Sequence, residues 1–211
     1  MTTRQNYLDA AGVAAAFLRE PAVAASWEEP SALAKMSVGG LAAHLARQVI
    51  LIPGVLTAPP ADEAPISLLV HYARAKWRGA DLDDEANASI RDNGEQMAQP
   101  GAQAIAEQAA AAQVELTSLL AAEDPDRAIH LPWTAWALTL DSLLTTRMLE
   151  IVVHTDDLAA SLGLPTPEFP TPVVETVVDL LSRLAVQRHG AVPVLRALSR
   201  AERAPATIAA I

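Results

Sequence analysis

The sequence contains no cysteine, and this absence excludes several kinds of chemistry. Disulfide bonds, thiolate metal ligands and a cysteine nucleophile are all ruled out. Any reaction at sulfur would therefore need a thiol supplied from outside the chain. The absence also fits a reducing compartment, so we expect a cytoplasmic protein.

Aromatic residues, positive charge and long apolar runs are also scarce. Aromatic residues make up only 4% of the 211 residues while alanine is abundant, a balance that favours helices over strands. The 15 basic residues are outnumbered by 25 acidic ones, and the net charge of −10 argues against a nucleic-acid partner. No uninterrupted apolar run reaches about 18 residues, so no membrane span is expected.

Apolar residues recur with helical spacing along most of the chain, and proline or glycine separates the segments. We predict helices over Gln5–Arg19, Val38–Ile52, Ile66–Trp77, Gln96–Ala121, Asp141–Leu162 and Val173–Arg188, and a short basic helix around Leu195–Arg203. Pro53-Gly54 should end the second helix, and Pro100-Gly101 can interrupt the fourth. The polar stretch Arg78–Glu95 is predicted to be partly helical. No run alternates convincingly enough to predict a strand.

This pattern predicts an all-α protein built as an up-down four-helix bundle. We expect residues 1–165 to form the bundle and residues 166–211 to add a C-terminal helix and tail packed on it. The length suits one domain, and no linker is long enough to separate two large ones. Bundles hold metal and cofactor sites in their cores, on side chains from facing helices.

The clearest chemical pattern is Glu150 followed four residues later by His154 in a largely apolar segment. At 3.6 residues per turn, the two side chains lie on one helix face and can meet one metal ion. A carboxylate among Leu, Ile and Val needs a partner, because burying it alone is costly. The same spacing also suits an ordinary hydrogen-bonded pair on a surface, so the local pattern leaves both interpretations open.

His44 offers a third ligand from the helix Val38–Ile52. A histidine in an apolar helix is more often a core residue with a hydrogen-bond partner than a ligand. If this helix faces the one that carries Glu150 and His154, the three side chains form a three-ligand site. Three protein ligands with one open position are the catalytic form of a zinc site.

The residues around these positions resemble the mycothiol-dependent maleylpyruvate isomerase family. The N-terminal signature is matched by Trp27, Pro30-Ser31 and Met36–Leu45, and the second signature by Arg147, Glu150–Thr155 and Asp157–Ala159. The resemblance implies the DinB-like four-helix bundle and a divalent metal bound by His44, Glu150 and His154. The chain departs from the family at Asp156, where a tryptophan is usual. Residues 171–211 hold one helix and a tail where the characterised isomerase has a further domain, so maleylpyruvate is not assumed as the substrate.

The resemblance also implies a low-molecular-weight thiol, such as mycothiol, as cosubstrate. We therefore predict a metal- and thiol-dependent isomerase or S-transferase that acts on a small electrophile, with zinc as the expected metal. A metal-dependent hydrolase on the same ligands and a non-catalytic metal-binding or regulatory bundle remain alternatives. The expected partners are the small thiol and the electrophile, and the chain is expected to be a monomer or a homodimer.

Three further charged residues are candidates for roles near the metal. Arg147 could hold a substrate carboxylate by a bidentate contact, or could instead form an ion pair with Glu150 or Asp157. Asp157 follows His154 by three residues and could orient its ring, or could be a solvated charge. Arg74 is a candidate for binding an anionic substrate.

Three ring side chains complete the set of candidates. His71 could be a fourth metal ligand, but an ordinary core or surface histidine is favoured, because a catalytic site keeps one position open. Trp133 and Trp136 could line the mouth of a pocket, although wall packing is the favoured role.

Overall fold

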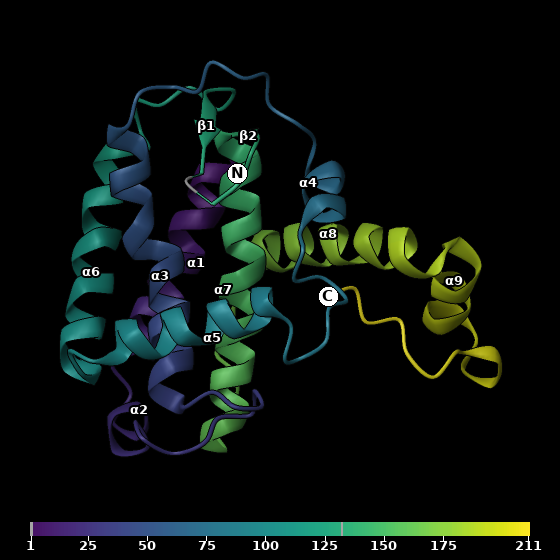
Figure 1. The fold of residues 1–211 in the computed structure, drawn as a ribbon, viewed down its shortest axis with the longest axis horizontal. Coiled ribbons are helices and arrows are strands. Elements are labelled where there is room, and N and C mark those ends of the chain that lie inside the picture. The colour runs from purple at the N-terminus through teal and green to yellow at the C-terminus, as the bar shows by residue number, and fades with distance from the viewer. Residues whose placement is uncertain (1, 132) are drawn as a thin grey trace.

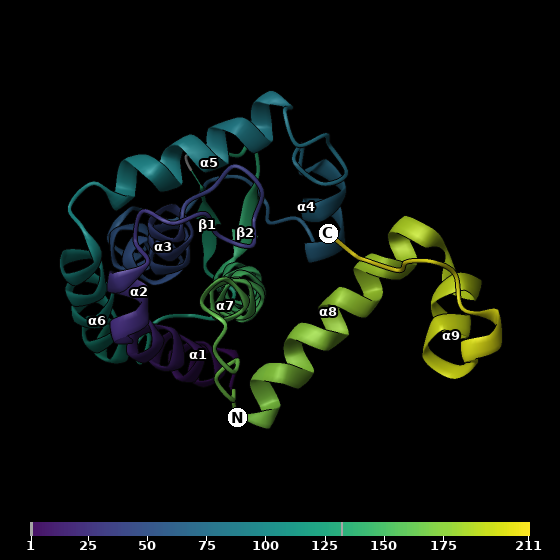
Figure 2. The same ribbon diagram turned by 90° about the horizontal axis from the view of Figure 1, so that it is seen from below.

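The core of the protein is a bundle of four long helices, seen in a computed structural model that describes residues 2–131 and 133–211 (Figure 1). The bundle helices are α1 (Thr3–Phe17), α3 (Val38–Thr57), α6 (Ala102–Leu119) and α7 (Leu140–Leu162). Both α1 and α3 pack against α6 and α7, so the four helices close into a ring. Figure 2 looks along the bundle, with α3 and α7 seen end-on. The predicted all-α bundle is confirmed.

Shorter helices cover the bundle and extend from it. They are α2 (Pro21–Ala25), α4 (Leu68–Arg74), α5 (Glu85–Ala98), α8 (Thr171–His189), α9 (Ala191–Ser199) and the 3-10 helix η1 (Ala201–Arg203). α5 lies across α3, and α8 packs against α1, α4 and α7. α9 packs against α8 and stands away from the bundle in Figures 1 and 2.

The path of the chain makes α3 and α6 run in the same direction, opposite to α1 and α7 (Figure 1). The connection from α3 to α6 passes through α4 and α5 and returns the chain to the other end of the bundle. The start of α1 is tied to the end of α6, because the Arg4 guanidinium donates hydrogen bonds to the carbonyls of Leu120 and Glu123. This order places α3 and α7 side by side.

The start of α3 is fixed by a cap and by close packing. Ser37 caps the helix by accepting a hydrogen bond from the Gly40 backbone N–H at 2.9 Å, and its own hydroxyl donates to Glu95 on α5 at 2.8 Å. A Cβ at Gly39 would lie 2.7 Å from the ring of Trp27, so only glycine fits there. These contacts hold the start of α3 against α5 and against the segment after α2 that carries Trp27.

The prediction that Pro53 and Gly54 end the second helix is wrong, because α3 continues to Thr57. Proline removes one backbone hydrogen bond from the helix, but later residues are held by packing. Leu56 is buried in the core, and Arg127 donates a 3.0 Å hydrogen bond to its carbonyl. Tertiary contacts therefore offset the local cost of the proline.

The structure also contains two strands that the sequence did not predict. β1 (Ala128–His130) and β2 (Ala137–Thr139) pair antiparallel and lead into α7. Each strand has only three residues, too few for an alternating pattern to stand out. The predicted interruption at Pro100-Gly101 is confirmed, since it separates α5 from α6.

α3 is long and apolar enough to cross a membrane when judged by length and composition alone. Most of it is buried inside the bundle, with Leu41, Leu45, Val49 and Ile52 fully covered. The core helix of a bundle passes the same test, so this feature is weak evidence for a membrane span.

Candidate metal centre

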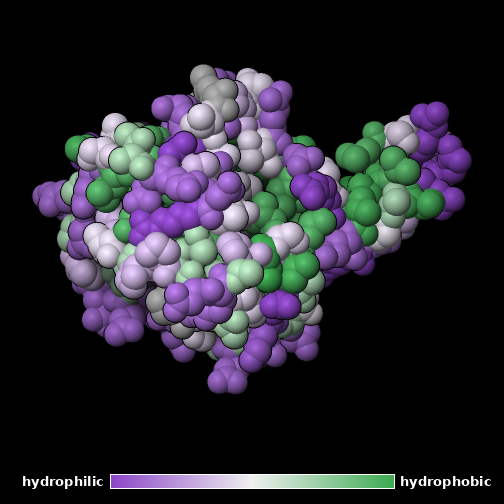
Figure 3. Space-filling view, turned by 90° about the horizontal axis from the view of Figure 1, so that it is seen from above, coloured by the Kyte–Doolittle hydropathy of each residue, from purple (hydrophilic) through white to green (hydrophobic). Residues whose placement is uncertain are grey.

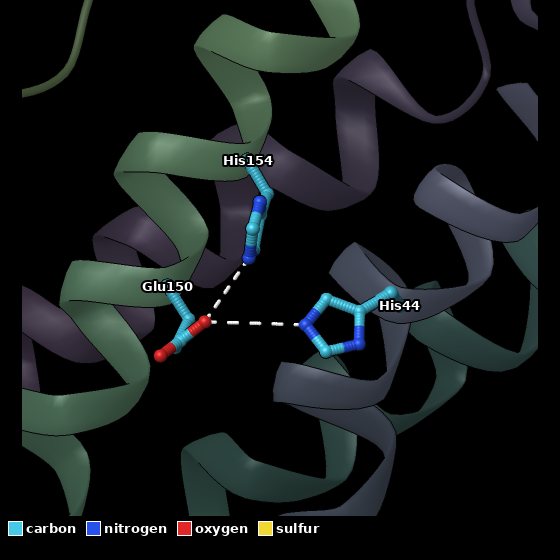
Figure 4. A group of neighbouring side chains, drawn as sticks. All are labelled: His44, Glu150 and His154. Atoms are coloured by element: carbon cyan, nitrogen blue, oxygen red, sulfur yellow. Dashed lines mark hydrogen bonds and ion pairs between the residues drawn. The ribbon is translucent and has the colours of Figure 1, made fainter. Parts of the chain in front are cut away.

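His44 on α3 faces Glu150 and His154 on α7, and the three side chains converge between the two helices (Figure 4). One donor atom from each residue lies within 4.8 Å of the other two. Glu150 Oε2 is 3.1 Å from His154 Nε2 and 3.9 Å from His44 Nε2. The two imidazole rings meet edge to face, with centroids 4.8 Å apart. The side chains are 13–16% exposed, so the cluster is shielded but can be reached from solvent.

Helix α7 holds its two members of the cluster through well-defined ends and a buried face. Thr139 caps its start by accepting a hydrogen bond from the Ser142 N–H at 3.1 Å. Gly163 ends it in the left-handed conformation, with φ at +63°. Leu149, Ile151 and Leu158 are fully buried and anchor the helix in the core. The face with Glu150 and His154 is thereby turned towards α3.

Glu150 and His154 carry opposite charges that stabilise each other. Burial raises the pKa of Glu150, but the hydrogen bond with His154 and the neighbouring His44 ring outweigh it and hold that pKa well below its usual value. Burial lowers the pKa of His154, but its hydrogen bonds to Asp157 and Glu150 raise it to about 9. Burial lowers the pKa of His44. The metal-free site therefore holds an ionised Glu150, a protonated His154 and a neutral His44 at pH 7.

The donor set fits a divalent metal. Asp157 Oδ2 lies 2.9 Å from His154 Nδ1, so this nitrogen carries the proton and Nε2 is directed at the cluster. Two imidazole nitrogens and one carboxylate oxygen are the ligands of many catalytic sites with one open position. Tetrahedral ligands with bonds of about 2 Å lie roughly 3.3 Å apart, so the Glu150–His154 separation of 3.1 Å already fits and the Glu150–His44 separation of 3.9 Å would shorten. Without a metal, the proton on the His154 ring supplies the positive charge next to Glu150.

A comparison with known families agrees with this geometry. Residues 8–159 match the family described as the mycothiol maleylpyruvate isomerase N-terminal domain. The chain belongs to this family. Its bundle is therefore the DinB-like fold, and the matched range includes all three members of the cluster. No curated protein and no solved structure matches the chain.

Within this family domain, Arg147 lies beside the cluster but does not form the ion pair considered from the sequence. Its guanidinium is buried and donates to Gln48 Oε1 at 2.6 Å and to Thr146 Oγ1 at 3.1 Å. Among the residues that the structure describes, no carboxylate lies within 4 Å of it. The buried charge of Arg147 thus has only neutral hydrogen-bond acceptors around it.

Gln48 is a residue that sequence reasoning missed. It follows His44 by one helical turn and donates a 2.8 Å hydrogen bond to the His44 carbonyl, while its side-chain oxygen accepts from Arg147. The Tyr7 hydroxyl donates to the Gln48 carbonyl at 3.0 Å. The position of Gln48 four residues after His44 on an apolar helix was the available signal.

His71 lies near the cluster but is engaged with a tryptophan. The Trp136 indole N–H donates to His71 Nδ1 at 3.0 Å, which leaves the proton of the neutral ring on Nε2. Burial, followed by the charge of Arg147, lowers the pKa of His71 to about 4. His71 is not a member of the cluster of possible metal ligands.

Two arginines contact the tryptophans that were candidates for a pocket mouth. Arg47, on α3, lies 4.6 Å from the ring centre of Trp133, and burial together with the charge of Arg147 lowers its pKa. Arg74, at the end of α4, is exposed and lies 5.5 Å from the ring centre of Trp136. In the described part of the chain, Arg74 makes no hydrogen bond or ion pair with the cluster. Both tryptophans thus make a cation–π contact, and Trp136 in addition donates its hydrogen bond to His71.

Tyr72, next to His71, is a second residue that sequence reasoning missed. It is 1% exposed, and its hydroxyl has no hydrogen-bond partner among the described residues. Burial and the negative charge of Glu150 both raise its pKa. A buried hydroxyl without a partner is costly, so this group is not explained by the packing of the described residues alone.

Proposed function

We propose that the protein is a metal- and thiol-dependent isomerase or S-transferase that acts on a small electrophile. The cosubstrate is a low-molecular-weight thiol of the mycothiol type, and the metal is zinc. The observation that carries the proposal is the cluster of His44, Glu150 and His154. It lies in a domain whose family description names mycothiol. The lack of cysteine supports an external thiol, and we place the activity in the cytoplasm, where small thiols stay reduced.

A divalent metal at the cluster would lower the pKa of a bound thiol, because the cation stabilises the thiolate. The chain contributes a single negative ligand, Glu150, so a positive charge remains to attract the thiolate. Asp157 holds the His154 ring with Nε2 directed at the cluster. His44 is neutral and needs to lose no proton before it can act as a ligand.

The charged residues around the cluster suit an anionic reactant. Arg147 and Arg47 place two guanidinium groups near Glu150 in a protein whose net charge is −10. Arg147 has neutral partners only, so a carboxylate on the electrophile would supply its missing counter-charge. Arg74 on the exposed side of Trp136 would assist the approach of such an anion. His71, which contacts Trp136, offers Nε2–H as a further donor.

The test is turnover of an electrophile with thiol and metal supplied or withheld separately. The metal-loaded protein should convert an activated electrophile only when mycothiol or a close analogue is present. A transferase consumes the thiol, whereas an isomerase returns it, so the thiol concentration distinguishes the two. The His44→Ala variant should lose the activity, while His130→Ala, which changes a half-exposed histidine outside the cluster, should keep it.

Two other outcomes would replace the proposal. Turnover of an ester or amide by the metal-loaded protein without thiol would identify a metal-dependent hydrolase on the same ligands. Stoichiometric metal binding with no thiol binding and no turnover would identify a non-catalytic binding or regulatory protein. Either result would leave the assignment of His44, Glu150 and His154 as metal ligands intact.

A further inference from the structure

Two arginine side chains line a hollow at the place where α4 lies beside α8 (Figures 1 and 2). Arg78 belongs to the segment after α4, and Arg188 stands in the last turn of α8. The hollow has a volume of about 180 Å³, and its other walls are Tyr72, Ala73 and Ala75. One water molecule needs only about 10–15 Å³ of such space, so the hollow has room for a small molecule.

Arg78 holds three parts of the chain together at this hollow. Its guanidinium donates hydrogen bonds to the carbonyl of Ala210 at 3.0 Å, to Gln187 Oε1 at 2.6 Å and to the carbonyl of Leu184 at 2.7 Å. These contacts attach α8 and the tail to the segment after α4. Figure 3 shows hydrophilic residues where the projecting part of the molecule joins the bundle, and hydrophobic surface farther out. All three acceptors are neutral, so none of them supplies a counter-charge to Arg78.

Arg188 is much less engaged than Arg78. It is exposed, and in the described part of the chain its one hydrogen bond is long, at 3.4 Å to the carbonyl of Ala209. A Cβ placed on Gly79 would lie 3.9 Å from its Nη2, so its guanidinium lies against the segment that carries Arg78. Burial, and after it the charge of Arg188, lowers the pKa of Arg78. The two cations are therefore close enough to repel each other.

The described residues place no acid beside this pair of arginines. Neither guanidinium forms an ion pair with any carboxylate that the structure describes, although the chain has 25 acidic residues and a net charge of −10. By contrast, Arg183 on the same helix lies 3.7 Å from Asp179. Two neighbouring cations without an acid form a local positive site in an acidic protein. The planar guanidinium is well suited to carboxylate and phosphate oxygens.

Tyr72 adds a buried donor to the same hollow. Its side chain is 1% exposed, and its hydroxyl has no hydrogen-bond partner among the described residues. Burial and the charge of Glu150 raise the pKa of Tyr72, while the charges of Arg147 and Arg78 lower it, so the hydroxyl is within electrostatic reach of Arg78. An anion held by the arginines would accept a hydrogen bond from this hydroxyl and remove the cost of leaving it unpaired.

We propose that this hollow binds an oxyanion, the carboxylate or phosphate group of a small molecule, between the guanidinium groups of Arg78 and Arg188. The Tyr72 hydroxyl is the third donor to the anion. Bound oxygens supply the counter-charge that the two arginines lack and the acceptor that the hydroxyl lacks. None of the three candidate metal ligands lines the hollow, and this site does not depend on the proposed function.

A purely structural role accounts for only part of this arrangement. Basic side chains near the C-terminal end of a helix interact favourably with its dipole, and Arg78 does so through the carbonyl of Leu184 on α8. The dipole does not explain why the Tyr72 hydroxyl is buried without an acceptor. It also does not explain the hollow of about 180 Å³ that Tyr72 shares with both arginines. A bound anion explains both features.

Calorimetric titration of inorganic phosphate, and separately of acetate, into the metal-stripped full-length protein tests the site. At an ionic strength held constant with chloride, at least one of the two anions should bind saturably, and the tighter one identifies the preferred group. Arg188→Gln should weaken this binding at least tenfold and leave the fold intact, because Arg188 makes only one long hydrogen bond. The matched control is Arg183→Gln, which changes another exposed arginine of α8 and should bind as the wild type does.

Tyr72→Phe tests the third donor with a readout that a structural hydroxyl would not give. The variant should bind the anion about tenfold more weakly, because a hydrogen bond to a charged acceptor is lost. Its stability to urea without the anion should not fall, since the hydroxyl has no partner there to lose.

Three results would overturn the proposal. The first is a wild-type protein that binds neither anion saturably, which would leave only water in the hollow. The second is undiminished affinity in Arg188→Gln or in a folded Tyr72→Phe variant. The third is binding that is lost in His44→Ala, because this would place the anion at the cluster of candidate metal ligands instead.

Discussion

Arg147 on α7 donates a 2.6 Å hydrogen bond to Gln48 on α3, and this contact joins the two helices that carry the candidate metal site. Gln48 also donates to the carbonyl of His44, so the same side chain touches the guanidinium and the backbone of a proposed ligand. The positions of His44 and Glu150 relative to each other thus depend partly on this buried polar contact.

Replacing Gln48 with leucine should destabilise the fold by about 2–3 kcal/mol, because it leaves a buried guanidinium without its acceptor. Urea denaturation of the metal-free protein measures the effect. Gln108→Leu on the exposed side of α6 is the control and should change stability by less than about 0.5 kcal/mol. Combining Gln48→Leu with Arg147→Met should recover part of the loss. Strict additivity of the two substitutions would contradict a direct coupling between the side chains.

Replacing His44 with alanine should abolish stoichiometric metal binding and leave the protein folded. His44 supplies the only proposed ligand from α3, so the two ligands on α7 would remain with much weaker affinity. Mass spectrometry of metal content, on protein purified without a histidine tag, gives the readout, and circular dichroism checks folding. His130→Ala should bind metal normally. Undiminished metal content in His44→Ala would remove this residue from the ligand set.

Metal affinity should rise about tenfold per pH unit as pH increases from 6 towards 9. The pKa of His154 is raised to about 9, so the metal must displace one proton from this ring across that range. The pKa of His44 is lowered by burial and that of Glu150 is held well below its usual value, so neither residue releases a further proton at pH 7 and above. Competition with a chromophoric chelator at pH 6, 7 and 8 measures the slope.

The variant Asp157→Asn separates the proton effect from the ligand itself. Asparagine keeps an acceptor oxygen but removes the negative charge that raises the pKa of His154, so the pH dependence should become shallower. Affinity at pH 8 should fall by about 10–100-fold, because the ring loses the carboxylate that orients it and raises its basicity as a ligand. An unchanged slope would show that the proton displaced by the metal comes from a group other than His154.

Protonation of His71 should destabilise the metal-free protein in acid. Its pKa is lowered to about 4 by burial and by the charge of Arg147, below the ordinary value of 6.5. The unfolded chain therefore binds a proton that the folded protein does not, so stability is lost as pH falls from about 6.5 to about 4. Between pH 7 and pH 4.5, His71→Gln should lose about 2 kcal/mol less stability than the wild type.

Urea denaturation at the two pH values measures this difference, and His130→Gln is the control. His130 is half-exposed, and the His130→Gln variant should show the same acid destabilisation as the wild type. Equal pH dependence in the wild type and His71→Gln would mean that the His71 ring is protonated equally easily in the folded and the unfolded protein.

The sequence predicted those parts of the fold and site that depend on local spacing. The apolar periodicity predicted the long helices, and the spacing of Glu150 and His154 placed both on one face of α7. His44 was a candidate from its place in an apolar helix, but the resemblance to a known family was needed to favour a ligand over a core histidine, because nothing local says which helix faces α7. The structure brings the three donor atoms within 4.8 Å of one another.

Contacts between distant segments could not be predicted in this way. Gln48 and Arg147 are 99 residues apart, and Trp136 and His71 are 65 apart, so neither pair leaves a pattern in the sequence. The continuation of α3 past Pro53 also depends on a distant segment, since Arg127 donates a hydrogen bond to the carbonyl of Leu56. Local rules failed where a tertiary contact offset a local cost.

Binding of a small thiol should require the metal and should strengthen as pH rises, because the thiolate is the form that binds a cation. The chain has no cysteine of its own, so no internal thiol competes. Glu150→Gln should weaken both metal and thiol binding, since it removes the charged ligand. The control variant is Glu107→Gln, which changes an exposed carboxylate on α6 and should bind both normally.

Calorimetric titration of mycothiol, or of a close analogue, into metal-loaded and metal-stripped protein provides the measurement. The expected result is a binding heat with the metal present and none after its removal, with affinity higher at pH 8 than at pH 7. The pH dependence distinguishes a thiolate on a cation from a thiol held only through the rest of its molecule, since the latter would bind equally at both pH values. Equal heats from the two forms of the protein would end the thiol-transferase proposal. The cluster of His44, Glu150 and His154 would then be better explained by a hydrolase or by a metal-binding protein without catalysis.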